Sequence, residues 1–131
     1  MTNAPNGLTP SLVALDPAVL DQLRELETAA DPGIAARVLG LYRDEAPKTM
    51  ATIASAVVAA DAAEIARAAH SLKSSSASIG ATVMSVLCAE LVAAGRGGKV
   101  LNAREIFVRV EAEQVRVQEA IGIELARWAK A

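Results

Sequence analysis

The sequence contains few of the residues on which several large classes of protein depend. Its aromatic residues are Tyr42, Phe107 and Trp128 alone, too few for the stacking surfaces that bind single-stranded nucleic acid. Cys88 is the only cysteine and His70 the only histidine, which excludes internal disulfides, cysteine-rich metal sites and multi-histidine metal sites. The composition therefore predicts a chain that binds no nucleic acid and holds no metal.

Charge and hydropathy narrow the class further. The formal net charge is −2 and the isoelectric point is about 5.4, without a block of Lys and Arg that could bind a phosphate backbone. No apolar run approaches the ~20 residues that span a bilayer. The first residues lack the basic and apolar stretches of a secretory signal. We therefore expect a cytoplasmic protein that makes no use of a membrane.

The 131 residues, 53 % of them hydrophobic, are enough for one domain with its own core. Pro5, Gly7 and Pro10 indicate a flexible tail over residues 1–11, followed by a single helical domain over 12–131. Apolar residues then recur at helical spacing, and signals for strands are absent. The expected helices cover about 17–28, 32–59, 61–78 and 81–94, with a last one that opens at Asn102.

The ends of these helices carry recognisable signals. Asp16 and Asp31 each precede a proline, an arrangement typical of an N-cap followed by the first helical residue. Asp61 with Glu64 resembles a capping box, and Pro47 predicts a kink in the second helix. Four long helices joined by short loops indicate an all-α protein. We expect an antiparallel four-helix bundle with a short extra N-terminal helix.

Residues 61–79 hold the chain's clearest candidate for chemistry. A helical projection places Ile65, Leu72 and Ile79 toward the bundle, with Ser75 and Ser76 nearby, and His70 on the opposite face. The outward neighbours of His70 are small or basic: Ala63, Ala66, Arg67, Lys73, Ser74 and Ala77. An exposed imidazole is substantially neutral near pH 7 and is then a competent nucleophile toward phosphorus.

The local sequence AHSLKSSSASIGA, from Ala69 to Ala81, resembles the signature AHxLKGxxxxxGA of histidine-containing phosphotransfer (HPt) domains. Asp61, Pro47 and Cys88 extend the likeness beyond the motif. The resemblance implies a phosphorelay carrier whose His70 accepts a phosphoryl group from an aspartate of a receiver domain, or passes one to it. By the same resemblance Lys73 neutralises phosphoryl oxygens and Gly80 makes the turn after the active helix.

The resemblance implies further assignments. Ser75 and Arg96 are candidates to stabilise the phosphate, and the receiver-docking surface consists of Ala63, Ala66, Arg67, Ser74 and Ala77. The expected partners are receiver domains of response regulators and a hybrid sensor histidine kinase. The chain needs no cofactor, since Mg²⁺ is expected on the receiver alone, and it acts as a monomer. Without a P-loop or a kinase glycine loop it is a carrier and not an enzyme.

Two departures from the family pattern and two other interpretations stay open. Ser74 stands where the family usually has glycine, and Val92 stands where some members have a polar residue that orients the imidazole. A bundle that docks a receiver without transferring phosphate is the first alternative. The second is the dimerisation and phosphoacceptor domain of a sensor kinase. The second is disfavoured because such domains have an acid directly after the histidine, where this chain has Ser71.

Overall fold

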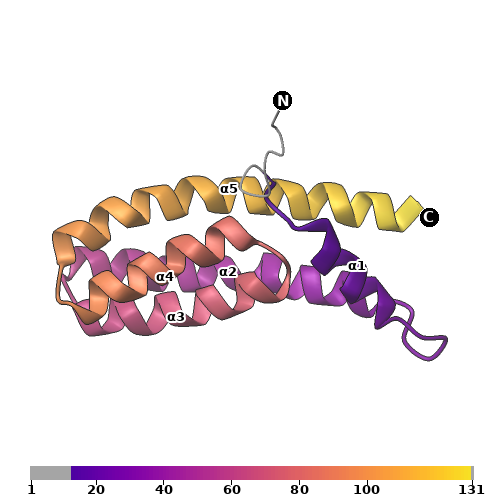
Figure 1. The fold of residues 1–131 in the computed structure, drawn as a ribbon, viewed down its shortest axis with the longest axis horizontal. Coiled ribbons are helices and arrows are strands. Elements are labelled where there is room, and N and C mark those ends of the chain that lie inside the picture. Colours follow the sequence, from indigo (N-terminus) through magenta and orange to yellow (C-terminus); the bar gives the residue numbers. More distant parts are fainter. Residues whose placement is uncertain (1–12, 131) are drawn as a thin grey trace.

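The computed structural model describes residues 13–130, and within them the chain forms five helices and no strands. The helices are α1 (Pro17–Glu25), α2 (Ile34–Val58), α3 (Ala62–Ser78), α4 (Thr82–Arg96) and α5 (Val100–Lys130). The predicted tail over 1–11 lies outside the described residues. Around the bundle α2 packs on α3, α3 on α4, α4 on α5 and α5 on α2, while α1 packs on α2. In Figure 1, α5 runs along one side of the molecule and α3 lies on the opposite side. The predicted four-helix bundle with a short N-terminal helix is confirmed.

The helix ends agree with the sequence signals in part. The Asp16 side chain accepts a hydrogen bond from the Ala18 N–H at 2.9 Å, and Asp61 accepts one from the Glu64 N–H at 3.1 Å, so both are N-caps. The prediction that Asp31 caps α2 is wrong. The N-cap is Gly33, which makes no side-chain cap, and Asp31 pairs with the Arg37 guanidinium at 2.5 Å instead.

Other predicted boundaries shift by a few residues. The last helix begins at Val100 instead of Asn102, and the first ends at Glu25 instead of residue 28. The helix α2 continues through Pro47 from Ile34 to Val58. Its proline removes one backbone donor without ending the helix.

The core lies between the four long helices and contains one buried stripe from each. Leu39 and Ile53 come from α2, and the others continue the same layers: Ile65, Leu72, Met84, Leu91, Val110, Val117 and Ile121. Cys88 is also buried, and desolvation raises the pKa of its thiol to about 12. This thiol is therefore core filling and is not a reactive group. In residues 13–130 no helix is both long enough and apolar enough to cross a membrane.

The turn from α3 to α4 requires glycine at position 80. Gly80 has a φ of +80°, and a Cβ added there would lie 2.9 Å from the Cβ of Val19. Its carbonyl accepts a hydrogen bond from the Asp16 N–H at 2.8 Å, which brings the start of α1 onto this turn. A side chain would be strained by the left-handed backbone and would also push α1 away. Gly80 thus fixes the end of α3.

A second glycine sets the spacing between α3 and α4. A Cβ added at Gly95 would lie 2.9 Å from the Ala62 carbonyl oxygen and 2.9 Å from the Ala66 nitrogen. Both are backbone atoms of α3, so the neighbour cannot move aside as a flexible side chain would. Only glycine allows α4 to approach α3 this closely. The expected end of the fourth helix at about residue 94 shifts by two residues, because α4 continues to Arg96 and Gly97 is its C-cap.

One buried hydroxyl connects three helices. The Tyr42 hydroxyl on α2 donates to the Gln114 side-chain oxygen of α5 at 3.0 Å and lies 3.0 Å from the Ser76 hydroxyl of α3. All three residues are buried. Desolvation is the largest cause that raises the pKa of Tyr42, to about 12. The Tyr42 hydroxyl therefore joins α2 to its neighbour α3 through Ser76 and to α5 through Gln114.

We predict that Gly95→Ala lowers the free energy of unfolding by about 1–3 kcal/mol, because the added methyl meets backbone and forces the two helices apart. Gly40→Ala is the matched control. The new methyl there would have only the Arg43 side chain near it, at 3.7 Å, so better helix propensity should raise stability by up to about 1 kcal/mol. Urea denaturation of both variants measures the difference. Equal changes in the free energy of unfolding for the two variants would contradict the close contact of Gly95 with the α3 backbone.

We predict that the free energy of unfolding falls as the pH rises from about 10 to about 12. The pKa of Tyr42 is about 10 in the unfolded chain and about 12 in the folded one. The contribution of Tyr42 to the free energy of unfolding is therefore fully present below pH 10 and is lost as the pH rises to about 12. Tyr42→Phe should remove this contribution and cost about 1–2 kcal/mol at neutral pH, because Ser76 and Gln114 lose their partner. Since Tyr42 is the only tyrosine, phenolate absorbance follows its ionisation directly. Ionisation near pH 10 in the folded protein would refute the prediction.

Candidate functional site

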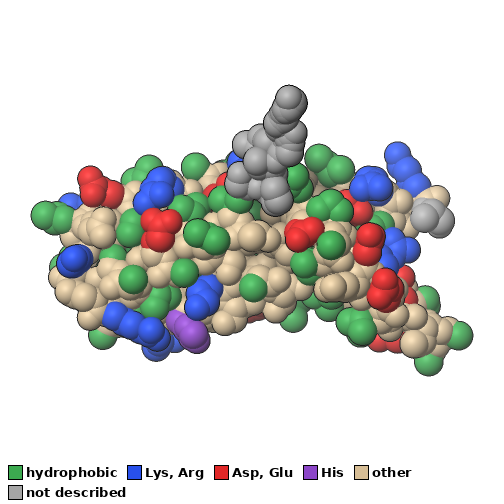
Figure 2. Space-filling view, viewed as in Figure 1, with side chains coloured by type: hydrophobic (Ala, Val, Ile, Leu, Met, Phe, Trp, Pro, Cys, Tyr) green, Lys and Arg blue, Asp and Glu red, His purple; other side chains and the backbone are tan. Residues whose placement is uncertain are grey.

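The site is built around His70, which projects from the outward face of α3. Leu72 and Ile65 anchor the opposite face of the helix in the core, so the rotation of α3 exposes the imidazole. Figure 2 shows the histidine at the molecular surface, with Lys and Arg side chains beside it. The sequence-based placement of His70 opposite the apolar stripe is confirmed.

Lys73 lies one helical turn after His70 and is half-buried between α3 and α4. No ion pair or hydrogen bond of its ammonium group occurs within residues 13–130. Its carbonyl oxygen accepts a hydrogen bond from the Ser85 hydroxyl of α4 at 3.3 Å. An uncompensated cation one turn from the ring can attract an anion placed on the imidazole. The sequence analysis did not identify Ser85. Its only signal is that a small polar residue occurs on the side of α4 that faces α3.

Arg67, one turn before His70, has its charge compensated. Its Nε and one terminal nitrogen each donate to the Glu64 carboxylate at 2.7 Å. The guanidinium holds the pKa of the Glu64 carboxyl below its ordinary value. Glu64 therefore does not complete the predicted capping box, and the backbone N–H of Asp61 donates to the Ala56 carbonyl at 2.9 Å instead. Of the two cations nearest to His70 along α3, Lys73 is the one whose charge is uncompensated.

The predicted docking surface is exposed except at one residue. Ala63, Arg67, Ser74 and Ala77 are all exposed on the face that carries His70. The prediction that Ala66 belongs to this surface is wrong. Ala66 is buried, because α4 approaches closely at Gly95 and covers it. Apart from Arg67, the exposed side chains of this predicted surface are small, so a partner can approach the His70 ring closely.

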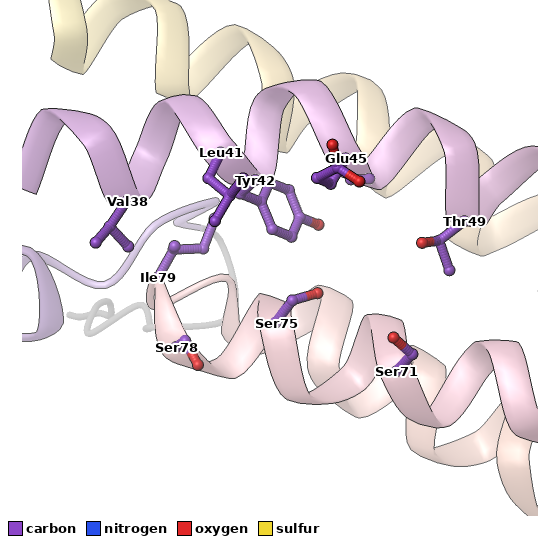
Figure 3. A pocket seen from close by; sticks show the side chains of 10 residues that line it. Val38, Leu41, Tyr42, Glu45, Thr49, Ser71, Ser75, Ser78 and Ile79 are labelled. Carbon is purple, nitrogen blue, oxygen red and sulfur yellow. The ribbon is translucent and has the colours of Figure 1, made fainter.

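The structure does not bring Ser75 to the imidazole. Five residues after His70, it lies about 140° further around the helix. It is exposed and donates to the Leu72 carbonyl of its own helix at 3.2 Å. Ser75 lines a groove of about 380 Å³ together with Ser71 and Tyr42. Figure 3 shows these side chains between α2 and α3.

Arg96 is the last residue of α4 and is exposed. Because α4 runs antiparallel to α3 and Gly95 packs on Ala62 and Ala66, Arg96 lies level with the first turns of α3. It is therefore one to two turns from His70 along the helix axis. Val92, where some family members have a polar residue, is buried and offers no hydrogen bond. Within the described residues no hydrogen bond or ion pair involves the His70 ring.

Among residues 13–130, no group of three or more His, Cys, Asp or Glu side chains could hold a metal ion. An exposed imidazole with an adjacent uncompensated lysine and small neighbours can act as a nucleophile toward an electrophile that a partner protein brings to it. This arrangement suits the transfer of an anionic group.

The comparisons with known proteins agree with this chemistry. The profile of the family described as "Hpt domain" matches residues 37–121, which include α3, α4 and most of α2 and α5. The chain belongs to the Hpt domain family. A crystal structure of histidine-containing phosphotransfer protein B (HptB) from Pseudomonas aeruginosa PAO1 is similar, with a TM-score of 0.79 and 26 % sequence identity. The match covers 95 % of this chain and 98 % of that one. No protein with curated annotation matches the sequence.

Membership in the Hpt family identifies the chain as a histidine phosphotransfer carrier of a phosphorelay. Hpt domain proteins are phosphocarriers and not kinases, and they interact with receiver domains and kinases of two-component relays. The four-helix architecture supplies what such a carrier needs, a rigid helix that presents one reactive side chain to solvent.

Proposed function

We propose that His70 is the phosphoryl acceptor of this carrier and that the group is bound at Nε2. The observation that carries the proposal is the outward position of the ring on α3, one turn from the uncompensated charge of Lys73. Nε2 is the ring nitrogen farther from the backbone, so the aspartyl phosphate of a receiver domain can reach it in line. Small neighbours at Ala63, Ser74 and Ala77 allow the two proteins to come close.

The proposed step is an in-line displacement at phosphorus. The lone pair of Nε2 forms the P–N bond as the P–O bond to the receiver aspartate breaks, and the aspartate leaves as a carboxylate. The proton of the neutral ring stays on Nδ1. Lys73 attracts the phosphoryl oxygens throughout the transfer as a point charge. The reverse step returns the phosphoryl group to an aspartate by the same path.

The other parts of the reaction belong to the partners in this proposal. The receiver domain of a response regulator, or that of a hybrid sensor histidine kinase, brings the aspartate and the Mg²⁺ ion. The carrier needs no cofactor, no ATP site and no second copy of itself, because one chain holds His70 and Lys73 together. We place the reaction in the cytoplasm, where we expect these partner domains.

We predict that His70→Gln abolishes labelling by phosphorylated receiver domains and leaves the helical circular dichroism unchanged, because the side chain is exposed and no core contact is lost. Transfer from a panel of receivers, followed by the acid lability of the product, measures this. The wild-type label should be acid-labile and base-stable, and ATP alone should give no label. Labelling of the His70→Gln variant would refute the proposal that His70 is the phosphoryl acceptor. Receiver binding without labelling of the wild type would favour the docking module.

We predict that Lys73→Ala slows phosphoryl transfer roughly tenfold to hundredfold while the receiver still binds, because a charge that stabilises the transferring group is lost. Arg96→Ala is the matched control and should slow transfer less than about threefold, since Arg96 lies one to two turns away on an exposed surface where water screens its charge. Rapid-quench transfer kinetics compare the two. Equal slowing of transfer by Lys73→Ala and Arg96→Ala would show that Lys73 does not stabilise the transferring phosphoryl group specifically.

A further inference from the structure

The outer face of α5 carries an unusual concentration of exposed aliphatic side chains. Leu101, Val108, Val115 and Ile123 are 74 %, 62 %, 60 % and 63 % exposed. The first three are spaced by seven residues and the fourth follows after eight, so they form one stripe opposite the buried stripe of the helix. Figure 2 shows hydrophobic side chains recurring along the edge of the molecule that α5 forms in Figure 1.

We infer that this stripe is an interface between two copies of the chain, paired through antiparallel α5 helices. A second copy is the occupant that the shape of the stripe favours. When Val108 of one copy faces Val115 of the other, Leu101 faces Gly122, because each lies seven residues outward from its valine. Gly122 faces open space and has no side chain, so it would leave room for the leucine of the other copy. Exposed Ala112 lies next to the two-fold axis, where a small residue lets the helices approach.

The charges beside the stripe are complementary in the same register. Arg104 lies four residues before Val108 and Glu119 four residues after Val115, so each Arg104 faces the Glu119 of the other copy, twice per dimer. Both side chains are exposed, and neither has an ion-pair or hydrogen-bond partner within residues 13–130. Glu111 is the unfavourable element, because it meets its own copy near the two-fold axis. A parallel pairing would place Arg104 opposite Arg104, so the charges select the antiparallel one.

The interface lies on the side of the bundle away from the phosphotransfer site. In Figure 1, α3 and α5 occupy opposite sides, so the dimer would present two His70 side chains outward. Each copy could therefore meet a receiver domain while paired. One helix pair offers an area at the low end of stable interfaces, so the dimer is weak and depends on concentration.

Sedimentation equilibrium of the full chain, from about one micromolar to about one millimolar, tests the inference. We expect reversible dimerisation that Val108→Ser weakens roughly tenfold or more, since two aliphatic side chains are lost from each dimer. Val58→Ser is the matched control. Val58 is 85 % exposed but lies at the end of α2, and its variant should associate like the wild type. A chain that stays monomeric over the whole range, or a dimer that Val108→Ser leaves intact, would overturn the interface.

Charge reversal tests the direction of the helices. Arg104→Glu or Glu119→Arg alone should weaken the dimer several-fold, because each places like charges opposite each other. The double variant Arg104→Glu with Glu119→Arg should return to the association of the wild type. Failure of the double variant to recover would overturn the antiparallel register. All three variants should accept phosphate from receivers at the rate of the wild type, because both positions lie away from His70.

Discussion

The close approach of α3 and α4 is the constraint on which the site depends. Gly95 lets α4 lie directly on the backbone of α3 at Ala62 and Ala66. Once that contact is made, α3 cannot rotate without forcing backbone into backbone. The Tyr42 hydroxyl fixes the same rotation from the other side of the helix through its contact with Ser76. The outward direction of His70 is thus a consequence of packing on the far faces of its helix.

The same packing determines which charges act near the ring. Arg67 is bound to Glu64 on the surface of α3, whereas the ammonium group of Lys73 has no counter-charge among the described residues. The Ser85 hydroxyl, 3.3 Å from the Lys73 carbonyl oxygen, holds the backbone of this lysine to α4. The positive charge near His70 therefore comes from Lys73, a residue of α3 whose backbone carbonyl is also bonded to α4. A phosphoryl group on the imidazole would meet a cation that no other charge competes for among the described residues and that extends from this fixed backbone.

The sequence predicted those parts of the structure that depend on one helix at a time. The exposure of His70 and Ser74 follows from the spacing of apolar residues in α3, and the capping by Asp16 and Asp61 follows from local hydrogen bonds. The burial of Ala66 could not be predicted, because it depends on Gly95, which is far away in the sequence. The buried contact of Tyr42, Ser76 and Gln114 joins three helices and has no local signal.

Contacts that the local sequence does not show also explain the wrong prediction for Asp31 and the position of Ser75. Asp31 carries every local sign of an N-cap, but its carboxylate pairs with Arg37 and the helix begins after Gly33. Ser75, which the resemblance makes a candidate to stabilise the phosphate, stays a prediction, and its side chain lines the groove beside α2. Both cases show that neighbours along the chain can face different surroundings.

The absence of any hydrogen bond to the His70 ring from residues 13–130 has an energetic consequence. A ring held by a fixed acceptor would favour one tautomer, and the bundle would then stabilise either the free or the modified form. In the proposed function the ring is fixed only through its helix, so the free energy of a P–N bond on His70 would stay close to that of phosphohistidine in water, apart from the attraction of Lys73. A carrier of this kind would set no direction of its own, and the phosphorylation state of its partners would decide which way the group flows.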